Sequence, residues 1–358
     1  MKRAFSCAIF QSEAIVSHIK MTTVFILSAA AALTGCSQAP PPTAETHGVG
    51  NIVRLDPAFD AIVPRDAQIE KVGGGFEFTE GPVWRPDGHI WFSDVTGNVV
   101  RSITPSGQVE VLIRNGGGES QAPPGSFVGP NAMVNDKDGY VLLCQHTNRR
   151  IVRVSKDLEI TPYIDKYHGK RLNSPNDLVY KSDGALYFTD PPYGLLKQDD
   201  DPAKELKFNG VFRYAGGKLQ PVIQDLTRPN GIAFSPDEKT LYIANSDEAR
   251  KVWMRYDVAS NGTVSNGRVF ADVTAEKEEG VPDGMKVDSQ GNVYGSGPGG
   301  IWVFSPDGKH LGTIKPGEVP ANCAWGDDGK TLYITARTSV YRIKLAVAGE
   351  KPLYQTYQ

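Results

Sequence analysis

The chain has 358 residues, and its 38 lysines and arginines nearly balance 41 aspartates and glutamates, for a formal net charge of −3. That balance gives no electrostatic support for nucleic-acid binding, which uses an excess of positive charge on one face. The length is compatible with two domains or with one large all-β domain.

The N-terminal residues resemble an export signal. Lys2, Arg3 and Lys20 precede an apolar stretch at 24–33, which is too short to span a bilayer as a helix. The stretch runs into the letters LTGC at 33–36, which resemble the bacterial lipoprotein cleavage box. We therefore expect residues 1–35 to be a lipoprotein-type signal peptide, with Cys36 lipidated. An ordinary cleaved signal is the alternative.

Residues 36–64 include three consecutive prolines at 40–42 and are expected to form a polar tether or linker. The expected location is periplasmic, with an anchor in the outer membrane through the lipid on Cys36 and no other membrane contact. An exported protein meets an oxidising compartment. The two cysteines beyond the signal, Cys144 and Cys323, fall in repeats that are not neighbours, so we expect two buried free thiols.

A strand–turn–strand pattern begins after residue 65. Residues 176–190, NDLVYKSDGALYFTD, show it clearly: a polar residue, an apolar run, a turn and a second apolar run. In every copy the first residue lies eight positions before the turn residue. The six copies begin at Glu80, Asn131, Asn176, Asn230, Asp283 and Ala321.

Two more candidate strands follow in most repeats, such as 99–103 and 109–113 in the first. Four-stranded units of roughly 47 residues are typical of a β-propeller. The last repeat lacks a fourth strand after Leu345, whereas the strand-like residues 68–72 precede the first. The sequence therefore predicts an all-β fold, a six-bladed β-propeller over 65–347 whose last blade is closed by an N-terminal strand. Residues 348–358 remain as a C-terminal tail, and long loops at 115–129 and 195–209 should flank the site.

Register along the blades predicts a site. The first strand of each propeller blade lines the central channel, so residues that begin these strands form a ring at one mouth. Five of the six are polar and supply two carboxylates and three amide oxygens: Glu80, Asn131, Asn176, Asn230 and Asp283. The ends of the second strands, such as Asp190, should lie near the same mouth. Hard oxygen donors favour Ca²⁺, with Mg²⁺ or Mn²⁺ as substitutes and Zn²⁺ less well suited.

Each of these residues has an ordinary explanation when taken alone. An Asn or Asp after Pro is usually a turn residue, and a single Glu is usually solvated. Five polar residues in one register favour a site, because buried unpaired oxygens are costly without a cation or water. A lone histidine such as His146 is usually structural. Tyr193 is compatible equally with a substrate cap and with loop packing. No Gly-x-Ser-x-Gly motif supports a serine hydrolase.

Five motifs carry a resemblance to a known family: EGPVW at 80–84, NSPND at 173–177, FTDPPYG at 188–194, RPNG at 228–231 and PDGM at 282–285. On these motifs residues 68–345 resemble the gluconolactonase/regucalcin (senescence marker protein) family of six-bladed propeller lactonases. The resemblance implies one divalent metal ion, with Asp283 also the general base. The implied metal ligands are Glu80, Asn176, Asn230 and Asp283. The expected substrate-binding residues are Asn131, Asn176, Asp190 and Tyr193.

The implied reaction is hydrolysis of a sugar (aldono-) lactone such as gluconolactone, in which the metal polarises the lactone carbonyl and Asp283 takes a proton from water. Two alternatives use the same fold. One is an organophosphate or phosphotriester hydrolase at the same site, and the other is a non-catalytic periplasmic binding propeller. The sequence leaves the oligomeric state open.

Overall fold

The structure is a computed structural model that describes residues 48–356. The predicted signal peptide, Cys36 and the linker up to residue 47 lie outside the described residues. Within 48–356, no helix has the length and hydrophobicity needed to cross a membrane.

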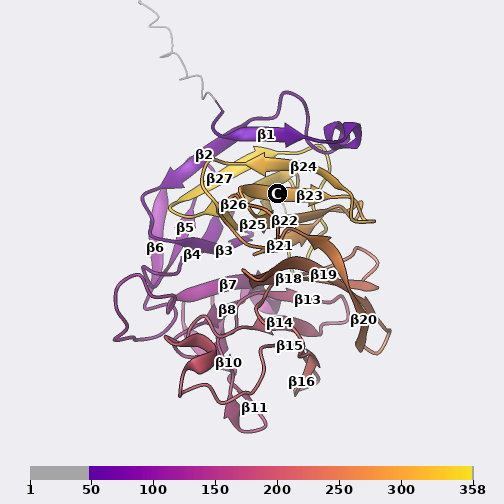
Figure 1. Ribbon diagram of the computed structural model, residues 1–358. Coiled ribbons are helices and arrows are strands. Elements are labelled where there is room, and N and C mark those ends of the chain that lie inside the picture. Colours follow the sequence, from indigo (N-terminus) through magenta and orange to yellow (C-terminus); the bar gives the residue numbers. More distant parts are fainter. Residues whose placement is uncertain (1–47, 357–358) are drawn as a thin grey trace, which may run out of the picture. The chain divides into compact units, whose positions relative to one another are not determined.

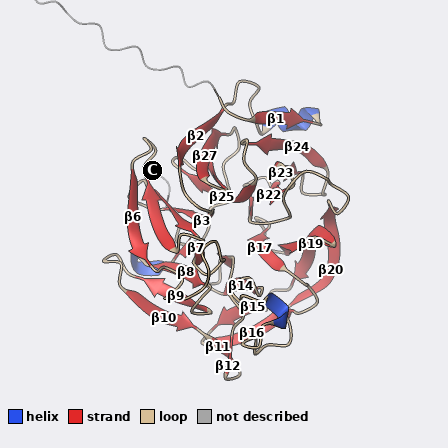
Figure 2. Cartoon of the chain, turned by 60° about the vertical axis from the view of Figure 1, so that its left-hand side comes forward, coloured by secondary structure: helices blue, strands red, loops and turns tan. Residues whose placement is uncertain are grey.

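Six sheets surround a central channel, each with its first strand innermost (Figures 1 and 2). Blade 1 contains β3 (Thr79–Trp84), β4 (Ile90–Asp94), β5 (Val99–Ile103) and β6 (Val109–Arg114). Blade 2 contains β7 (Pro130–Asn135), β8 (Val141–Gln145), β9 (Arg150–Val154) and β10 (Ile160–Ile164). Blade 3 contains β13 (Leu178–Tyr180), β14 (Leu186–Asp190), β15 (Gly210–Ala215) and β16 (Lys218–Ile223).

Blade 4 contains β17 (Pro229–Phe234), β18 (Thr240–Asp247), β19 (Arg250–Val258) and β20 (Val264–Asp272). Blade 5 contains β21 (Met285–Val287), β22 (Val293–Gly297), β23 (Gly300–Phe304) and β24 (His310–Lys315). Blade 6 contains β25 (Pro320–Gly326), β26 (Thr331–Ala336), β27 (Ser339–Lys344) and β2 (Ile69–Gly74). Smaller elements are the pair β11 (Lys166–Tyr167) and β12 (Lys170–Arg171), with the 3₁₀ helices η1 (Pro57–Ala61), η2 (Lys137–Gly139) and η3 (Gln198–Asp200). The predicted six-bladed propeller is confirmed.

The N-terminal strand closes the ring. β2 pairs antiparallel with β27, with Ile69 opposite Ile343 and Glu70 opposite Arg342. The sheet of blade 6 therefore joins the two ends of the repeat array, as the missing fourth strand predicted. This closure leaves no open edge between the first and last blades.

Part of the segment expected as a linker packs on the propeller. β1 (Asn51–Arg54) pairs with β24 and adds a fifth strand to blade 5. Asp56 caps the following η1, and its carboxylate accepts a hydrogen bond from Ala58 N–H at 2.9 Å. η1 buries Phe59 completely, and Val63 is buried just after it. The apolar side chains within 59–63 could have indicated that this segment packs on the propeller, but the prolines around them favoured a linker.

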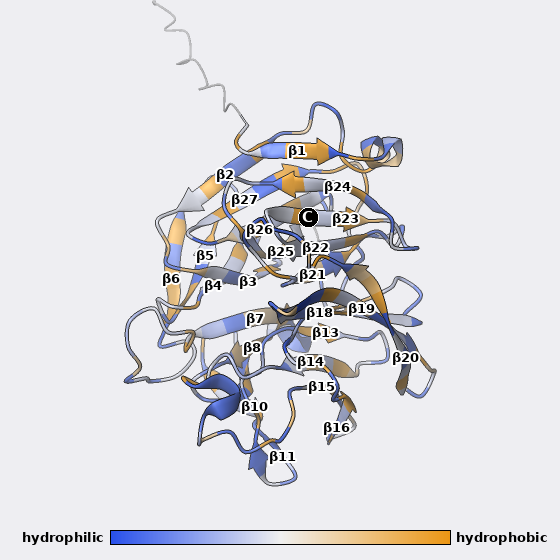
Figure 3. Cartoon of the chain, viewed as in Figure 1, coloured by the Kyte–Doolittle hydropathy of each residue, from blue (hydrophilic) through white to orange (hydrophobic). Residues whose placement is uncertain are grey.

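Apolar side chains fill the spaces between neighbouring sheets. Tyr187 of blade 3 meets Phe234 of blade 4 edge to face at 5.0 Å, and Trp84 of blade 1 stacks on Tyr333 of blade 6 at 5.8 Å. Figure 3 shows orange, hydrophobic segments on strands such as β6, β20 and β24, while the loops are largely blue. Cys144 and Cys323 are both buried free thiols, as predicted.

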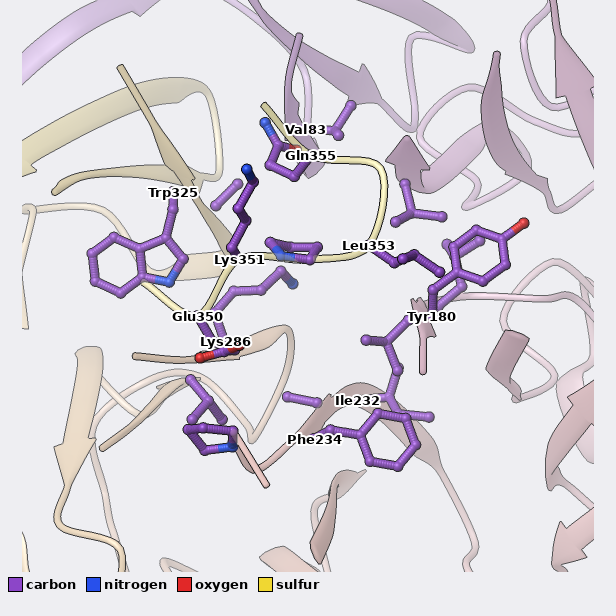
Figure 4. Close-up of a pocket in the computed structure, with 18 of the residues that line it drawn as sticks. Val83, Tyr180, Ile232, Phe234, Lys286, Trp325, Glu350, Lys351, Leu353 and Gln355 are labelled. Carbon is purple, nitrogen blue, oxygen red and sulfur yellow. The ribbon is translucent and has the colours of Figure 1, made fainter. Parts of the chain in front are cut away.

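The C-terminal tail crosses the end of the channel where the first strands finish (Figure 4). We call residues 349–355 the strap. Glu350 N–H donates to Val287 O at 2.9 Å at one end, and Gln355 Nε2 donates to Trp84 O at 3.1 Å at the other. A cavity of about 300 Å³ lies beneath it, lined by the first-strand ends and the strap. Because the predicted ring begins these strands, the strap covers the opposite mouth.

Candidate metal centre

Glycines let the first strands approach closely around the ring. A Cβ on Gly81 would lie 2.5 Å from Ala132 Cα, and one on Gly231 would lie 2.2 Å from Asp283 O. A Cβ on Gly284 would lie 1.9 Å from Asn322 Cγ. All are far below contact distance. The neighbours of Gly81 and Gly231 are backbone atoms, so only glycine fits there, whereas a Cβ on Gly284 would displace the Asn322 side chain. Each glycine directly follows a predicted ligand, and the close packing draws those ligands together.

Glu80 is buried, with 3% of its surface exposed. Its Oε2 accepts hydrogen bonds from Asn322 Nδ2 at 3.0 Å and from Gly81 N–H. Burial, and then the nearby Asp177 carboxyl, raise the pKa of Glu80 to about 7.

Asp283 lies in the same electrostatic environment. Burial, followed by the Glu80 carboxyl, raises the pKa of Asp283 well above its ordinary range. Hydrogen bonding from Gly284 N–H and Asn230 only partly offsets this rise. Two carboxyls from blades 1 and 5 therefore influence each other at one end of the channel. A positive charge between them would favour the ionised form of both.

Three amide oxygens complete the predicted ring. Asn131, Asn176 and Asn230 are 4%, 3% and 5% exposed. The Oδ1 atom of each is buried and has no hydrogen-bond partner among the described residues. Because an unpaired buried oxygen costs free energy, these atoms fit a site that is completed by a cation or water.

His146 holds the Asn131 amide. Its Nδ1 lies 2.9 Å from Phe127 O, which assigns the ring proton to Nδ1. Nε2 then accepts from Asn131 Nδ2 at 3.2 Å, so Asn131 Oδ1 is the atom left unpaired. Burial lowers the pKa of His146 to about 4, which keeps the imidazole neutral. The lone histidine has the structural role expected of it.

The predicted substrate residues divide into two groups. Tyr193 lies at the ring: burial raises the pKa of its hydroxyl, hydrogen bonding to Ser246 and Asn230 opposes the rise, and Asp283 adds to it. Asp190 is fully buried, and its Oδ2 accepts from Asn173 N–H at 2.8 Å. In this position the Asp190 carboxylate supports the turn that leads into Asn176.

The sequence pattern missed Asp177, Asn322 and Lys286. Asp177 is 2% exposed, and burial raises the pKa of its carboxyl while Lys286 lowers it. Asn322 directly follows Ala321, the one apolar member of the ring register. A single register predicts one inward residue at each strand start, whereas blades 3 and 6 also place the next residue, Asp177 or Asn322, in the channel.

The donor set has a distinct chemistry. Within residues 48–356, no three His, Cys, Asp or Glu side chains gather in a way that could hold a metal ion. Two carboxylates with amide oxygens make up the candidate centre instead, a donor set that suits a hard divalent cation. Fold and site together define a six-bladed propeller with an oxygen-lined centre at one mouth of its channel.

A family model described as "SMP-30/Gluconolactonase/LRE-like region" matches residues 78–338. The chain belongs to this family. It is 38% identical over 346 residues to a gluconolactonase from Zymomonas mobilis, which covers 93% of this chain and 97% of that protein.

Two solved structures share both fold and sequence. A putative gluconolactonase superposes with a TM-score of 0.74 and 31% identity, over 84% of this chain and 99% of that one. A gluconolactonase from Xanthomonas campestris superposes with a TM-score of 0.72 and 29% identity, over 83% and 97% of the two chains.

Proposed function

We propose that this protein hydrolyses sugar lactones at the mouth of the channel opposite the strap, with one divalent cation bound by Glu80, Asn176, Asn230 and Asp283. One observation supports the cation: Glu80 and Asp283, two carboxyls whose pKa values are raised, lie in a ring with amide oxygens that lack partners among the described residues. The gluconolactonase relatives support the substrate class.

Asp283 is the proposed general base. When bound, the cation would act as a Lewis acid on the lactone carbonyl. The positive charge would also lower the pKa of Asp283, which burial and Glu80 otherwise raise. The ionised Asp283 carboxylate then accepts a proton from the attacking water, and returns it to the ring oxygen as the ester bond opens.

The remaining polar groups are proposed to orient the sugar. The Tyr193 hydroxyl lies beside Asn230 and Asp283, so it can hydrogen-bond a substrate hydroxyl at the centre. Asn131 and Asn176 present amide oxygens that accept from sugar hydroxyls. Such a polar rim suits a hydroxylated lactone better than an apolar ester.

A lactone panel tests this proposal. Purified protein is treated with chelator, and acid release from glucono-1,5-lactone is followed after Ca²⁺, Mg²⁺, Mn²⁺ or Zn²⁺ is added, with a phosphotriester in parallel. We expect lactone turnover that chelator abolishes and Ca²⁺ restores. Turnover of the phosphotriester alone, or calorimetric binding of lactone without acid release, would contradict the proposal.

We also propose export and lipidation at Cys36, on the LTGC pattern at 33–36. Mass spectrometry of the mature N-terminus would show a diacylglyceryl modification, which Cys36→Ser would remove. An unmodified Cys36 in membrane-associated protein would contradict it.

A further inference from the structure

Blade 6 contributes to the centre through Asn322 rather than through Ala321. The Asn322 side chain is 1% exposed, and its Nδ2 donates to Glu80 Oε2 at 3.0 Å. Gly81 N–H donates to the same oxygen. Both hydrogen bonds of the Glu80 carboxylate in the described chain thus fall on Oε2, which leaves Oε1 as the oxygen available to a cation.

Two donors fix which way the Asn322 amide points. Cys323 N–H donates to Asn322 Oδ1 at 2.9 Å, and Lys286 Nζ lies 3.4 Å from the same atom. A flipped amide would turn its NH₂ group toward two donors and its oxygen toward the Glu80 carboxylate. Only one orientation satisfies all three neighbours, and it aims the NH₂ group at Glu80.

The space for this amide comes from Gly284. A Cβ on Gly284 would lie 1.9 Å from Asn322 Cγ and 2.2 Å from Oδ1. Gly284 also directly follows Asp283 and donates its N–H to Ala321 O at 2.7 Å. The backbone that carries one proposed ligand therefore shapes the group that orients another.

Lys286 approaches from the strap-covered side of the channel (Figure 4), where it lines the cavity. Its Nζ donates to Met285 O at 2.9 Å as well as facing Asn322 Oδ1. The Lys286 ammonium group therefore contacts both the backbone of β21, at Met285 O, and the Asn322 amide that donates to Glu80.

We propose that Asn322, oriented by Lys286 and seated over Gly284, is a positioning residue that holds Glu80 for cation binding. The inference rests on the proposed function, because it concerns the same cation. Loss of the Asn322 amide would free Glu80 to rotate. The cation affinity should fall, whereas the chemistry of the cation-loaded enzyme should change little.

Calorimetric titration of chelator-treated full-length protein with Ca²⁺ tests the proposal. Asn322→Leu keeps the branching and the number of heavy atoms of the side chain and removes the amide, so Kd should rise about 10- to 100-fold, the range for residues that orient metal ligands. Gly284→Ala should raise Kd similarly by displacing the amide, and Lys286→Met should raise it less. Saturating Ca²⁺ should restore most of the kcat of Asn322→Leu.

Asn135→Leu is the matched control. Asn135 is also a buried channel-strand asparagine, but its amide bonds Trp84 O and Gln355 beside the strap. The Asn135→Leu substitution should lower thermal stability without changing the Kd for Ca²⁺. A wild-type Kd in Asn322→Leu, or an equal rise in Asn135→Leu, would overturn the inference. If Asn322→Leu does not fold, the Kd values for Ca²⁺ of Gly284→Ala and Lys286→Met test the proposal in its place. Failure of wild-type protein to bind any divalent cation would instead overturn the proposed function.

Discussion

Glu80 and Asp283 are two carboxyls that share one electrostatic environment at one end of the channel. Burial and repulsion between carboxyls raise the pKa of both: Asp177 adds to the rise at Glu80, and Glu80 adds to the rise at Asp283, so each resists ionisation on its own. The neighbouring asparagine oxygens cannot donate a proton to relieve that repulsion. A divalent cation would stabilise the ionised carboxylates and would also accept the lone pairs of the amide oxygens.

Removal of either carboxyl should therefore remove activity. Asp283→Ala deletes the proposed base as well as a ligand, and we expect a loss of at least about 100-fold in kcat, the lower range for a general base. Glu80→Ala should lose a similar factor through weaker cation binding. Initial rates on glucono-1,5-lactone at several Ca²⁺ concentrations measure both. Wild-type turnover from either variant would refute the assignment, and Asp328→Ala, at an exposed turn, serves as the control.

The raised pKa of Glu80 also predicts how stability depends on pH. Its carboxyl has an ordinary pKa of 4.5 in the unfolded chain and about 7 in the fold, so between these values the native state binds the extra proton. Cation-free protein should thus lose stability as pH rises from 5 to 8. Ca²⁺ needs the ionised carboxylates, so its stabilising effect should grow over the same range.

Thermal melting at pH 5 and pH 8, with chelator or with Ca²⁺, measures both effects. Glu80→Gln should flatten part of the pH dependence of the melting temperature in chelator. Asp190, whose pKa burial raises to about 7, and Asp283, whose pKa burial also raises, should preserve the rest. A cation-free melting temperature that rises across this window, in wild type but not in Glu80→Gln, would contradict the prediction.

At the scale of the strand, irregular pairing brings the ligands inward. The pairing of β3 with β4 shifts between Glu80 and Val83, and β17 with β18 shifts between Pro229 and Ile232. β25 with β26 shifts between Pro320 and Asn322. Extra residues at the start of these inner strands break the simple alternation of side chains. This is why Asn322 faces the channel when its neighbour Ala321 was expected to.

Close packing of the inner strands can be tested at Gly231. Its missing Cβ would stand 2.2 Å from Asp283 O, which is backbone and cannot move aside cheaply. Gly231→Ala should destabilise the protein by about 1–3 kcal/mol, the usual cost of overpacking, and should weaken Ca²⁺ binding by moving Asp283. Gly184→Ala, at a turn with open space, is a control for stability loss without a site effect. Chemical denaturation and calorimetry measure the two quantities.

At the scale of the whole molecule, the repeat made the propeller, its closing strand and the ring predictable. Equal spacing from ring residue to turn placed Glu80 and Asp283 at one mouth although they are far apart in the sequence. Features outside the repeat were not predictable in this way. β1, η1 and the strap occur once each, so no repeat predicts their positions. Their apolar residues, such as Phe59 and Leu353, pack against the folded propeller, and the sequence pattern alone does not indicate where.

Ring closure gives the last prediction. β2 supplies the outer strand of blade 6, and residues before it cover blade 5 through β1. Removing residues 1–75 should leave β27 unpaired on one side and expose Ile343, which β2 now covers. An open strand edge beside an apolar face favours edge-to-edge association between chains. The truncated chain should therefore unfold at a lower temperature and aggregate. Removing only residues 1–35, the proposed signal peptide, should leave melting unchanged, because a signal peptide is absent from the mature protein. A truncated chain that melts like the full propeller would show that blade 6 is stable with three strands.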